Sequence, residues 1–372
     1  MTHYHLWIPN IFEFKGGIQV YSAFLLEALQ KIAPDAQYDV FLKHDTRAFP
    51  RFLPETRFHF AGNVPLKLRT GGFALQLVKA AIAQRPDLII STHINFTVVA
   101  DYLKRLLGIP YWVVAHGTEV WDIPKASLRQ AIHNADRILA VSEYTRDRLL
   151  AHTPLNPEKI SILPNTFDES RFKIAPKPPH LLHRHHLHSH GPILLTVARL
   201  DPSQLYKGYD KIIEALPRLR AAIPNIHYLL VGKGEDYSRI EKLIQTHHLQ
   251  DHVTLVGFVS DEELADYYNL CDVFAMPSYG EGFGIVYLEA LAAGKPVLGG
   301  NQDGAVDALC QGKLGVLVNP HDISEIANTL IEVCQKKYNN SLLYQPEQLR
   351  AKVIEVYGFS TFTETLTQIL NQ

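Results

Sequence analysis

Short runs of apolar and β-branched residues alternate with amphipathic helical patterns along nearly the whole chain. Each run is apolar on both faces, which is typical of strands buried in a parallel sheet. The candidate strands are His5–Pro9, Tyr38–Leu42, Leu88–Ser91, Tyr111–Ala115, Ile138–Val141, Ile160–Leu163, Ile193–Val197, Tyr228–Val231, Val253–Leu255, Val273–Met276, Pro296–Leu298 and Val316–Val318. Helical patterns include Lys207–Ala222, Asp261–Leu270 and Ile323–Cys334. This alternation predicts an α/β fold made of two doubly wound parallel sheets.

The length of 372 residues favours two domains, because one core rarely grows that large. The alternation breaks over about residues 173–192, which contain four prolines and six histidines. We therefore expect a first domain over residues 1–175, a linker over 176–191 and a second domain over 192–350. Residues 351–372 are expected to form a helix that crosses back to the first domain.

The composition is that of a globular protein, with 47% hydrophobic and 20% charged residues. No apolar run is long enough to span a bilayer, and the first residues resemble a strand more than a secretory signal. The three cysteines have no metal-binding or redox spacing, which favours a reducing compartment. We expect a cytoplasmic protein with no cofactor and no nucleic-acid partner.

The richest motif spans Pro277–Pro296 and follows a candidate strand. Its glycines, among them Gly282 and Gly284, are expected to let the backbone approach a ligand closely, and a helix N-terminus there suits a phosphate. Glu281 and Glu289 have seven residues between them, which nearly repeats one face of a helix. A plain glycine-rich turn with two surface glutamates remains the alternative.

Other candidate ligand residues also follow strand ends, where ligands bind in such folds. Arg199 lies just past a strand, and Lys207 opens the next helical pattern, so the two cations are placed to neutralise a diphosphate. Gly16 and Gly17 precede a helix, and His116 directly follows a strand. Solvated surface charges, an ordinary turn and a structural histidine are the respective alternatives.

Two segments carry weaker signals. The histidine-rich stretch His180–His190 has ligand atoms for a metal but no spacing for one tetrahedral site, so adventitious binding is the preferred interpretation. Leu66–Arg85 mixes leucines with basic residues and is suited either to an anionic bilayer or to packing on the first sheet. Residues 1–175 carry 20 Lys and Arg against 16 Asp and Glu, a basic excess that would suit an anionic acceptor or peripheral contact at the inner membrane face, while ordinary scatter of surface charge is the preferred interpretation.

Together these motifs resemble retaining glycosyltransferase family 4, whose GT-B fold has two Rossmann-like domains facing a cleft. The resemblance covers nearly the whole chain, and its most specific motif is the Glu281 and Glu289 pair. Supporting matches are Ala198–Leu200 with Lys207–Gly208, Pro164–Asp168, Val256–Val259 and Gly315–Val318.

The resemblance implies a role for each site residue. Arg199 and Lys207 would hold the donor diphosphate, Glu289 the ribose and Glu281 the transferred sugar. Gly16 and Gly17 would pass close to the phosphate, and His116 would lie beside the reacting sugar. The remaining implied donor contacts are Val256, Phe258, Gly282, Phe283, Gly284 and Ile285.

The implied function is retaining, metal-independent transfer of a hexose from a UDP- or GDP-sugar, with UDP slightly favoured, to a glycan or lipid-linked acceptor in polysaccharide biosynthesis. No Asp-x-Asp motif is present to hold a divalent ion at the donor, and no metal ligands are assigned. A nucleotide-sugar epimerase of the same fold and a non-catalytic nucleotide-sugar-binding protein are the alternatives. Asp303–Asp307 departs from the family pattern, having no proline and a shorter acid, which weakens inference about the sugar.

Overall fold

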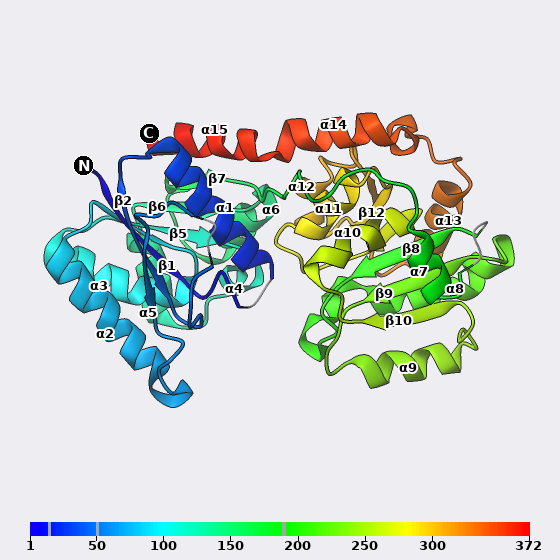
Figure 1. Cartoon of the computed structure of the whole chain (residues 1–372), viewed down its shortest axis with the longest axis horizontal. Helices are drawn as coiled ribbons and strands as arrows, with labels where there is room; N and C mark the ends of the chain where they lie inside the picture. Colours follow the sequence, from blue (N-terminus) through cyan, green and yellow to red (C-terminus); the bar gives the residue numbers. More distant parts are fainter. Residues whose placement is uncertain (14–15, 50–51, 188–190) are drawn as a thin grey trace. The chain divides into compact units, whose positions relative to one another are not determined.

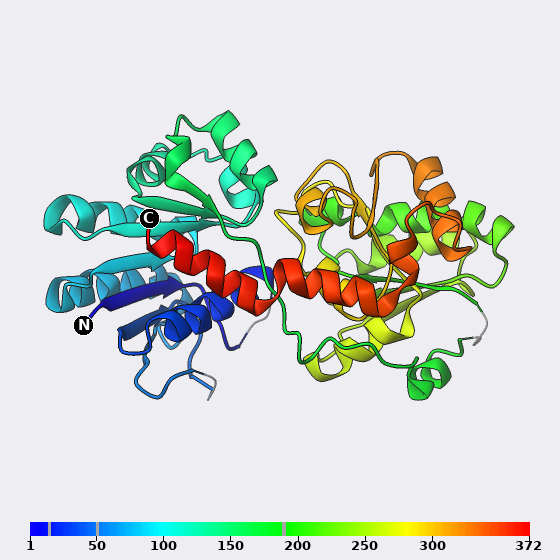
Figure 2. The same cartoon turned by 90° about the horizontal axis from the view of Figure 1, so that it is seen from above.

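A computed structural model describes residues 1–13, 16–49, 52–187 and 191–372. The chain divides into two compact units, each with its own parallel sheet (Figures 1 and 2). Unit 1 comprises Met1–Thr166 together with Phe359–Gln372, and unit 2 comprises Phe167–Gly358. Both sheets have the strand order of a doubly wound fold, so the expected α/β architecture of two Rossmann-like units is confirmed.

The sheet of unit 1 has seven strands among the described residues, in the order β3-β2-β1-β4-β5-β6-β7, and all its pairs are parallel. The strands are β1 His3–Ile8, β2 Gln37–Leu42, β3 Arg57–Phe60, β4 Leu88–Ser91, β5 Tyr111–Ala115, β6 Arg137–Ala140 and β7 Ile160–Ile162. The helices of this unit are α1 Gly17–Ile32, α2 Leu66–Gln84, η1 Ile94–Phe96, α3 Thr97–Leu107, α4 Thr118–Trp121, α5 Ala126–Asn134, α6 Glu143–His152, η2 Pro157–Lys159 and α15 Phe359–Leu370.

The sheet of unit 2 has six parallel strands among the described residues, in the order β10-β9-β8-β11-β12-β13. The strands are β8 Ile193–Val197, β9 His227–Val231, β10 Val253–Gly257, β11 Val273–Met276, β12 Val297–Gly300 and β13 Val316–Val318. The helices of this unit are α7 Pro179–Arg184, η3 Pro202–Lys207, α8 Tyr209–Ala222, α9 Tyr237–Thr246, α10 Asp261–Leu270, α11 Ile285–Ala292, α12 Ala305–Ala308, α13 Ile323–Cys334, η4 Ser341–Tyr344 and α14 Pro346–Tyr357.

Burial explains why the apolar runs become strands and the amphipathic runs become helices. Leu6, Val40 and Ile89 in unit 1 are fully buried, and so are Leu194 and Phe274 in unit 2. Such strands can only be central to a sheet that helices cover on both faces. On one face of the unit 1 sheet, α1 packs against α15, and the two helices lie side by side in both views (Figures 1 and 2).

The structure corrects several boundaries. The sequence pattern does not predict β3, because Arg57–Phe60 is a partly exposed edge strand. The expected linker contains α7, and its Leu181 is fully buried within unit 2. The division at Thr166 therefore comes earlier than the expected division at residue 175. His188 and His190 of the histidine-rich stretch lie outside the described residues.

The C-terminal segment contains two helices, α14 and α15, instead of the one expected over residues 351–372. Gly358 separates them in an extended conformation, with φ of −63° and ψ of 160°. The division into units follows this break, so α14 belongs to unit 2 and α15 to unit 1.

Candidate functional site

The candidate donor site lies at the switch point of the unit 2 sheet. Strand β8 pairs with β9 on one side and with β11 on the other, so the connections after β8 and β11 leave in opposite directions. Ligands of doubly wound sheets bind beyond the carboxyl ends of the strands at this point. Arg199 follows β8 and Glu281 follows β11, so both candidates occupy the loops that flank the switch point.

Lys207 and Glu281 form the central contact of this site. The Lys207 ammonium donates to Glu281 Oε1, although 74 residues separate the two in sequence. Their side chains are only 16% and 15% exposed, so the ion pair is largely withdrawn from solvent. The structure therefore brings together two residues that the sequence analysis assigned separately.

The backbone of Glu281 is held by the loop after β12. Its N–H donates to Asp303 Oδ2 at 2.7 Å, and its carbonyl accepts from the Gly304 N–H at 2.8 Å. Burial raises the pKa of Asp303 to about 6, against the lowering effect of hydrogen bonds from Ser278 and from backbone N–H groups. In the sequence, Asp303 is only a departure from the family pattern, yet its carboxylate holds the backbone of Glu281 in place.

Lys207 does not open the following helix, contrary to the sequence analysis. It ends the short helix η3, and Gly208 then turns the chain into α8 with φ of +71°. A side chain at position 208 would place its Cβ 2.3 Å from the Pro277 carbonyl oxygen. Glycine is therefore required where the Lys207 loop contacts the residue after β11.

The glycines of the Pro277–Pro296 motif are also explained by packing within the chain. A Cβ at Gly280 would lie 2.6 Å from the Tyr206 ring, and one at Gly284 would lie 2.5 Å from the Tyr287 ring. The Gly284 backbone has φ of +92° and precedes α11. Contact with these two tyrosines accounts for both glycines, whereas the sequence analysis attributed them to a ligand.

Glu289 lies on α11 and contacts a different part of unit 2. Its Oε2 accepts a hydrogen bond from Tyr268 Oη at 2.7 Å. Burial raises the pKa of Glu289 to about 7, opposed by the Tyr268 hydrogen bond and by the charge of Arg171. The helical-face argument for the glutamate pair is wrong, because Glu281 precedes the helix that begins at Ile285.

The other unit 2 candidates lie on several elements. Arg199 is exposed, and its charge helps to lower the pKa of Asp201, after the hydrogen bonds from Ser203. Val256 lies within β10, while Phe258 is 70% exposed, with Lys233 Nζ 4.8 Å from its ring centroid. The motif residues Gly282, Phe283 and Ile285 are all buried.

In unit 1, His116 is held in a neutral state by its surroundings. Its Nε2 lies 3.0 Å from the Thr92 carbonyl oxygen, and its backbone N–H donates to Glu119 Oε1 at 2.6 Å. Burial lowers the pKa of His116 to about 3, so the imidazole is neutral at pH 7. Because the Thr92 carbonyl can only accept, Nε2 carries the proton and Nδ1 keeps its lone pair.

The glycine pair of unit 1 stands at the start of α1. Gly16 precedes the helix in an extended conformation, and Gly17 is its first residue. A Cβ at position 17 would meet no atom of the described residues within 4 Å. Packing among the described residues therefore does not explain Gly17, in contrast to Gly280 and Gly284.

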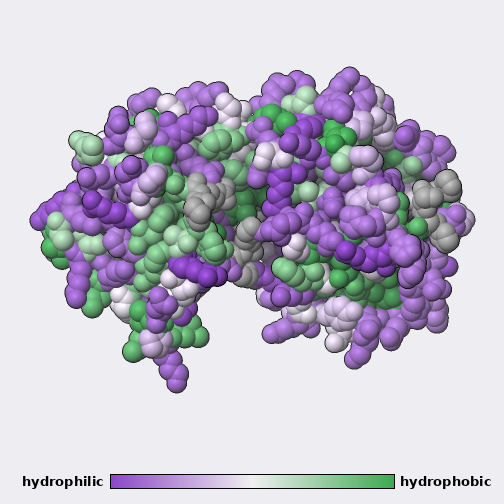
Figure 3. Space-filling model, viewed as in Figure 1, coloured by the Kyte–Doolittle hydropathy of each residue, from purple (hydrophilic) through white to green (hydrophobic). Residues whose placement is uncertain are grey.

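Helix α2 combines a buried stripe with an exposed one. Phe73, Leu77 and Ala81 pack into the unit 1 core, whereas Leu66 is 75% exposed and Leu68 is 67% exposed. Hydrophobic and hydrophilic side chains alternate over this end of the surface (Figure 3). Among the described helices, none is both long and apolar enough to cross a membrane.

Comparisons with known proteins identify the class. The family model "Glycosyltransferase Family 4" matches residues 15–171, and the model "Glycosyl transferases group 1" matches residues 182–352. Among solved structures, the sucrose-phosphate synthase of Thermosynechococcus elongatus has a TM-score of 0.82 at 23% identity and covers 100% of this chain and 99% of its own. Anabaena HepE in complex with UDP has a TM-score of 0.80 at 21% identity, with 100% of both chains covered. These structures share the fold.

Curated relatives give the family. A mannosyltransferase of Mycolicibacterium smegmatis, which is GDP-mannose-dependent and acts on phosphatidylinositol monomannoside, is 33% identical over 280 residues, covering 69% of this chain and 72% of the relative. The protein of the same name from Mycobacterium tuberculosis is 33% identical over 230 residues, and the alignment spans 58% of its length. The chain belongs to the family 4 glycosyltransferases.

Proposed function

We propose that this protein transfers a hexose from a nucleoside diphosphate sugar to a glycan or lipid-linked acceptor, with retention and without a catalytic metal. The observation that carries the proposal is the largely buried Lys207–Glu281 pair at the switch point of unit 2. A cation beside a carboxylate can serve the two ends of one donor, because the cation attracts phosphate and the carboxylate accepts from sugar hydroxyls.

The chemistry follows from the leaving group. The bond between the anomeric carbon and the diphosphate oxygen breaks, and negative charge develops on the diphosphate. Lys207 and Arg199 are the side chains that we assign to this charge, since fixed cations stabilise it without reorganising. Glu281 would orient the transferred sugar, Glu289 would contact the ribose, and His116 and Gly17 of unit 1 keep the roles that the family resemblance implies.

The donor is proposed to be GDP-mannose, which revises the slight preference for UDP. The relatives that are 33% identical are GDP-mannose-dependent mannosyltransferases that act on a phosphatidylinositol glycan. Because these relatives act on a lipid-linked glycan, we infer a lipid-linked acceptor for this protein too. The exposed leucines of α2 support peripheral contact with a bilayer. The protein would then act at the cytoplasmic face of a membrane.

A donor panel assayed with and without acceptor tests the proposal. GDP-mannose and UDP-sugars would be incubated with the full chain and with a phosphatidylinositol mannoside, in the presence of a chelator. A glycosylated product whose new bond keeps the donor anomeric configuration supports the proposal. Donor isomerisation without acceptor would identify an epimerase, and tight donor binding without any turnover would identify a binding protein; either result overturns the assignment.

A further inference from the structure

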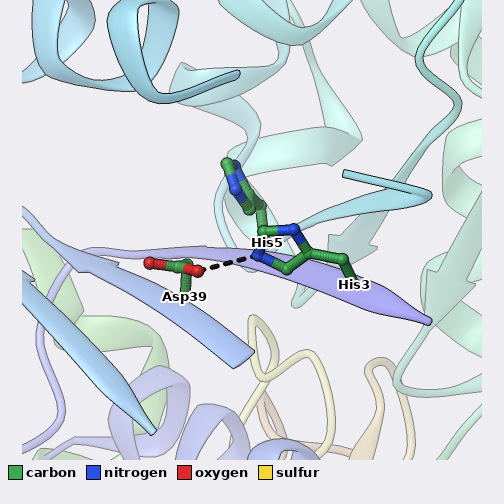
Figure 4. Close-up of side chains that lie close together, drawn as sticks. All are labelled: His3, His5 and Asp39. Atoms are coloured by element: carbon green, nitrogen blue, oxygen red, sulfur yellow. Dashed lines mark hydrogen bonds and ion pairs between the residues drawn. The ribbon is translucent and has the colours of Figure 1, made fainter. Parts of the chain in front are cut away.

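A buried cluster of histidine and aspartate side chains lies on one face of the unit 1 sheet, apart from the residues assigned to the donor. His3 and His5 are two positions apart on β1, and Asp39 pairs with His5 in the register of β1 and β2. Alternate residues of a strand point to the same face, so the three side chains converge (Figure 4). Among the described residues, this is the group of three that could hold a metal ion.

The carboxylate of Asp39 is the centre of the cluster. His3 Nε2 lies 2.7 Å from Asp39 Oδ2, and His59 Nε2 from β3 lies 2.5 Å from Asp39 Oδ1. One ligand atom from each of His3, His5 and Asp39 lies within 4.8 Å of the other two. Burial alone would raise the pKa of Asp39, but the hydrogen bonds from His59 and His3 outweigh it and lower the pKa to about 2.

His5 is the member whose hydrogen bonding is incomplete. The residue is fully buried, and among the described residues neither of its ring nitrogens has a partner at hydrogen-bond geometry, although the Gln84 side chain lies close enough to affect it. The neighbouring Gln84 from α2 donates to Asp39 Oδ1 at 3.3 Å, while its own Oε1 has no partner either. A buried polar group without a partner costs free energy, and a bound metal ion would satisfy the imidazole.

We propose that His3, His5 and Asp39 bind a zinc ion, with a water molecule as the fourth ligand. Imidazole and carboxylate are donors that zinc accepts in tetrahedral sites. Ligand bonds of about 2.0 Å at tetrahedral angles place the ligand atoms about 3.3 Å apart.

The position of the cluster favours a structural role. His3 is the first residue of β1, so the cluster lies toward the amino edge of the sheet, whereas ligands of such folds bind beyond the carboxyl edge. A zinc ion here would join β1 to β2 without taking part in sugar transfer, and the Asp39 carboxylate also contacts His59 of the edge strand β3. The inference therefore does not rest on the proposed function.

The alternative is a metal-free hydrogen-bonded network, in which a rotation of Gln84 satisfies His5. Metal binding and thermal unfolding of the full chain, purified without a histidine tag and stripped with a chelator, separate the two. Trp7, Trp112 and Trp121 are the three tryptophans of the chain, and all lie in unit 1. Tryptophan fluorescence therefore follows the unfolding of this unit alone.

The variants are chosen to separate this cluster from the histidine-rich stretch of unit 2. His3→Gln removes a ligand at the partly exposed edge, His5→Gln removes the buried one, and His183→Gln with His186→Gln is the matched control. We expect the wild type and the control to show the visible absorption of tetrahedral Co²⁺. Their unit 1 transition should rise by about 5–10 °C at zinc concentrations of one hundred times Kd.

His3→Gln should bind Co²⁺ at least tenfold more weakly and lose most of the shift. If His5→Gln does not fold, His3→Gln alone decides the question. An equal shift in the wild type and His3→Gln would overturn the proposal. So would loss of binding only in the histidine-rich control, or a wild-type protein whose stability responds to neither zinc nor chelator.

Discussion

The ion pair at the switch point makes a prediction about how two substitutions combine. In Lys207→Ala, the diphosphate loses a cation, and the Glu281 carboxylate also loses its partner and then repels the diphosphate. A charge-assisted hydrogen bond contributes about 1.5–3 kcal/mol, or roughly ten- to hundredfold in Kd. The freed carboxylate adds roughly 1 kcal/mol of repulsion, because two charges 5 Å apart at an effective dielectric of 20 interact by about 3 kcal/mol before solvent and salt screening.

We therefore expect Lys207→Ala to weaken binding of a free nucleoside diphosphate by about hundredfold, but by only about tenfold in a Glu281→Gln background. Glu281→Gln alone should bind the nucleotide no more weakly than the wild type, since it releases the Lys207 ammonium. Isothermal calorimetry with GDP and UDP measures all four proteins of the cycle. The matched control is the Lys177–Asp272 pair at 2.6 Å, because Asp272 precedes β11 and lies at the opposite edge of the sheet.

Equal effects of Lys207→Ala in both backgrounds would refute the reasoning, because they would show that Glu281 is not coupled to the diphosphate. A control cycle that changes nucleotide binding as much as the Lys207 cycle would refute it as well, since the effect would then come from general destabilisation. Either result would leave the ion pair as an element of unit 2 stability only.

Four further predictions follow from residues described above. Arg199→Ala should lower turnover by about hundredfold, because a fixed cation for the diphosphate is lost. Chelation should leave wild-type turnover unchanged at temperatures well below unfolding. An absolute need for added Mg²⁺ in the chemical step would contradict the prediction of metal-independent transfer. Burial raises the pKa of Glu289 to about 7, so the protonated group stabilises the fold fully below its unfolded pKa, and this contribution is lost as the pH rises through 7. Calorimetric unfolding should show that the stability of Glu289→Gln falls less than that of the wild type between pH 4.5 and 7.5. If the two proteins have the same pH profile of stability, the raised pKa of Glu289 is refuted. Leu66→Ser with Leu68→Ser should reduce co-sedimentation with anionic vesicles at least fivefold, whereas a wild type that does not sediment would refute membrane contact. Phe362→Ala should lower the unfolding temperature of unit 1, followed by tryptophan fluorescence, by about 10 °C. The buried Phe362 ring packs on Tyr21, with 5.7 Å between the ring centroids. An unchanged unfolding temperature would show that α15 is dispensable for this unit.

Most of the sheet could be predicted because its strands are apolar on both faces. Helices with regular patterns were also placed well, and Asp261–Leu270 and Ile323–Cys334 have the expected bounds. The edge strand β3 was missed, since its residues are half-exposed and carry no continuous apolar run. Helix α7 was missed because prolines and histidines hide the burial of Leu181.

The sequence pattern selects candidate site residues but does not give the contacts between them. Position after a strand end was enough to select Arg199, Glu281 and His116, because parallel strands share one carboxyl edge. Nothing in the local pattern joins Lys207 to Glu281 or Tyr268 to Glu289, since these pairs form only when distant loops meet. The proposed zinc cluster has a signal in the sequence: His3 and His5 are alternate residues of one strand, and Asp39 lies in the following strand.

The division of the chain has a consequence for its synthesis on the ribosome. Unit 1 is built from Met1–Thr166 and from Phe359–Gln372, with all of unit 2 encoded between them. The face of α1 that includes Tyr21 and Phe24 is not covered by α15 until residues 359–372 have been made. Unit 2 is synthesised after most of unit 1, which has to wait with this apolar helix face uncovered by α15. We expect nascent chains that end before Phe359 to expose that face to chaperones.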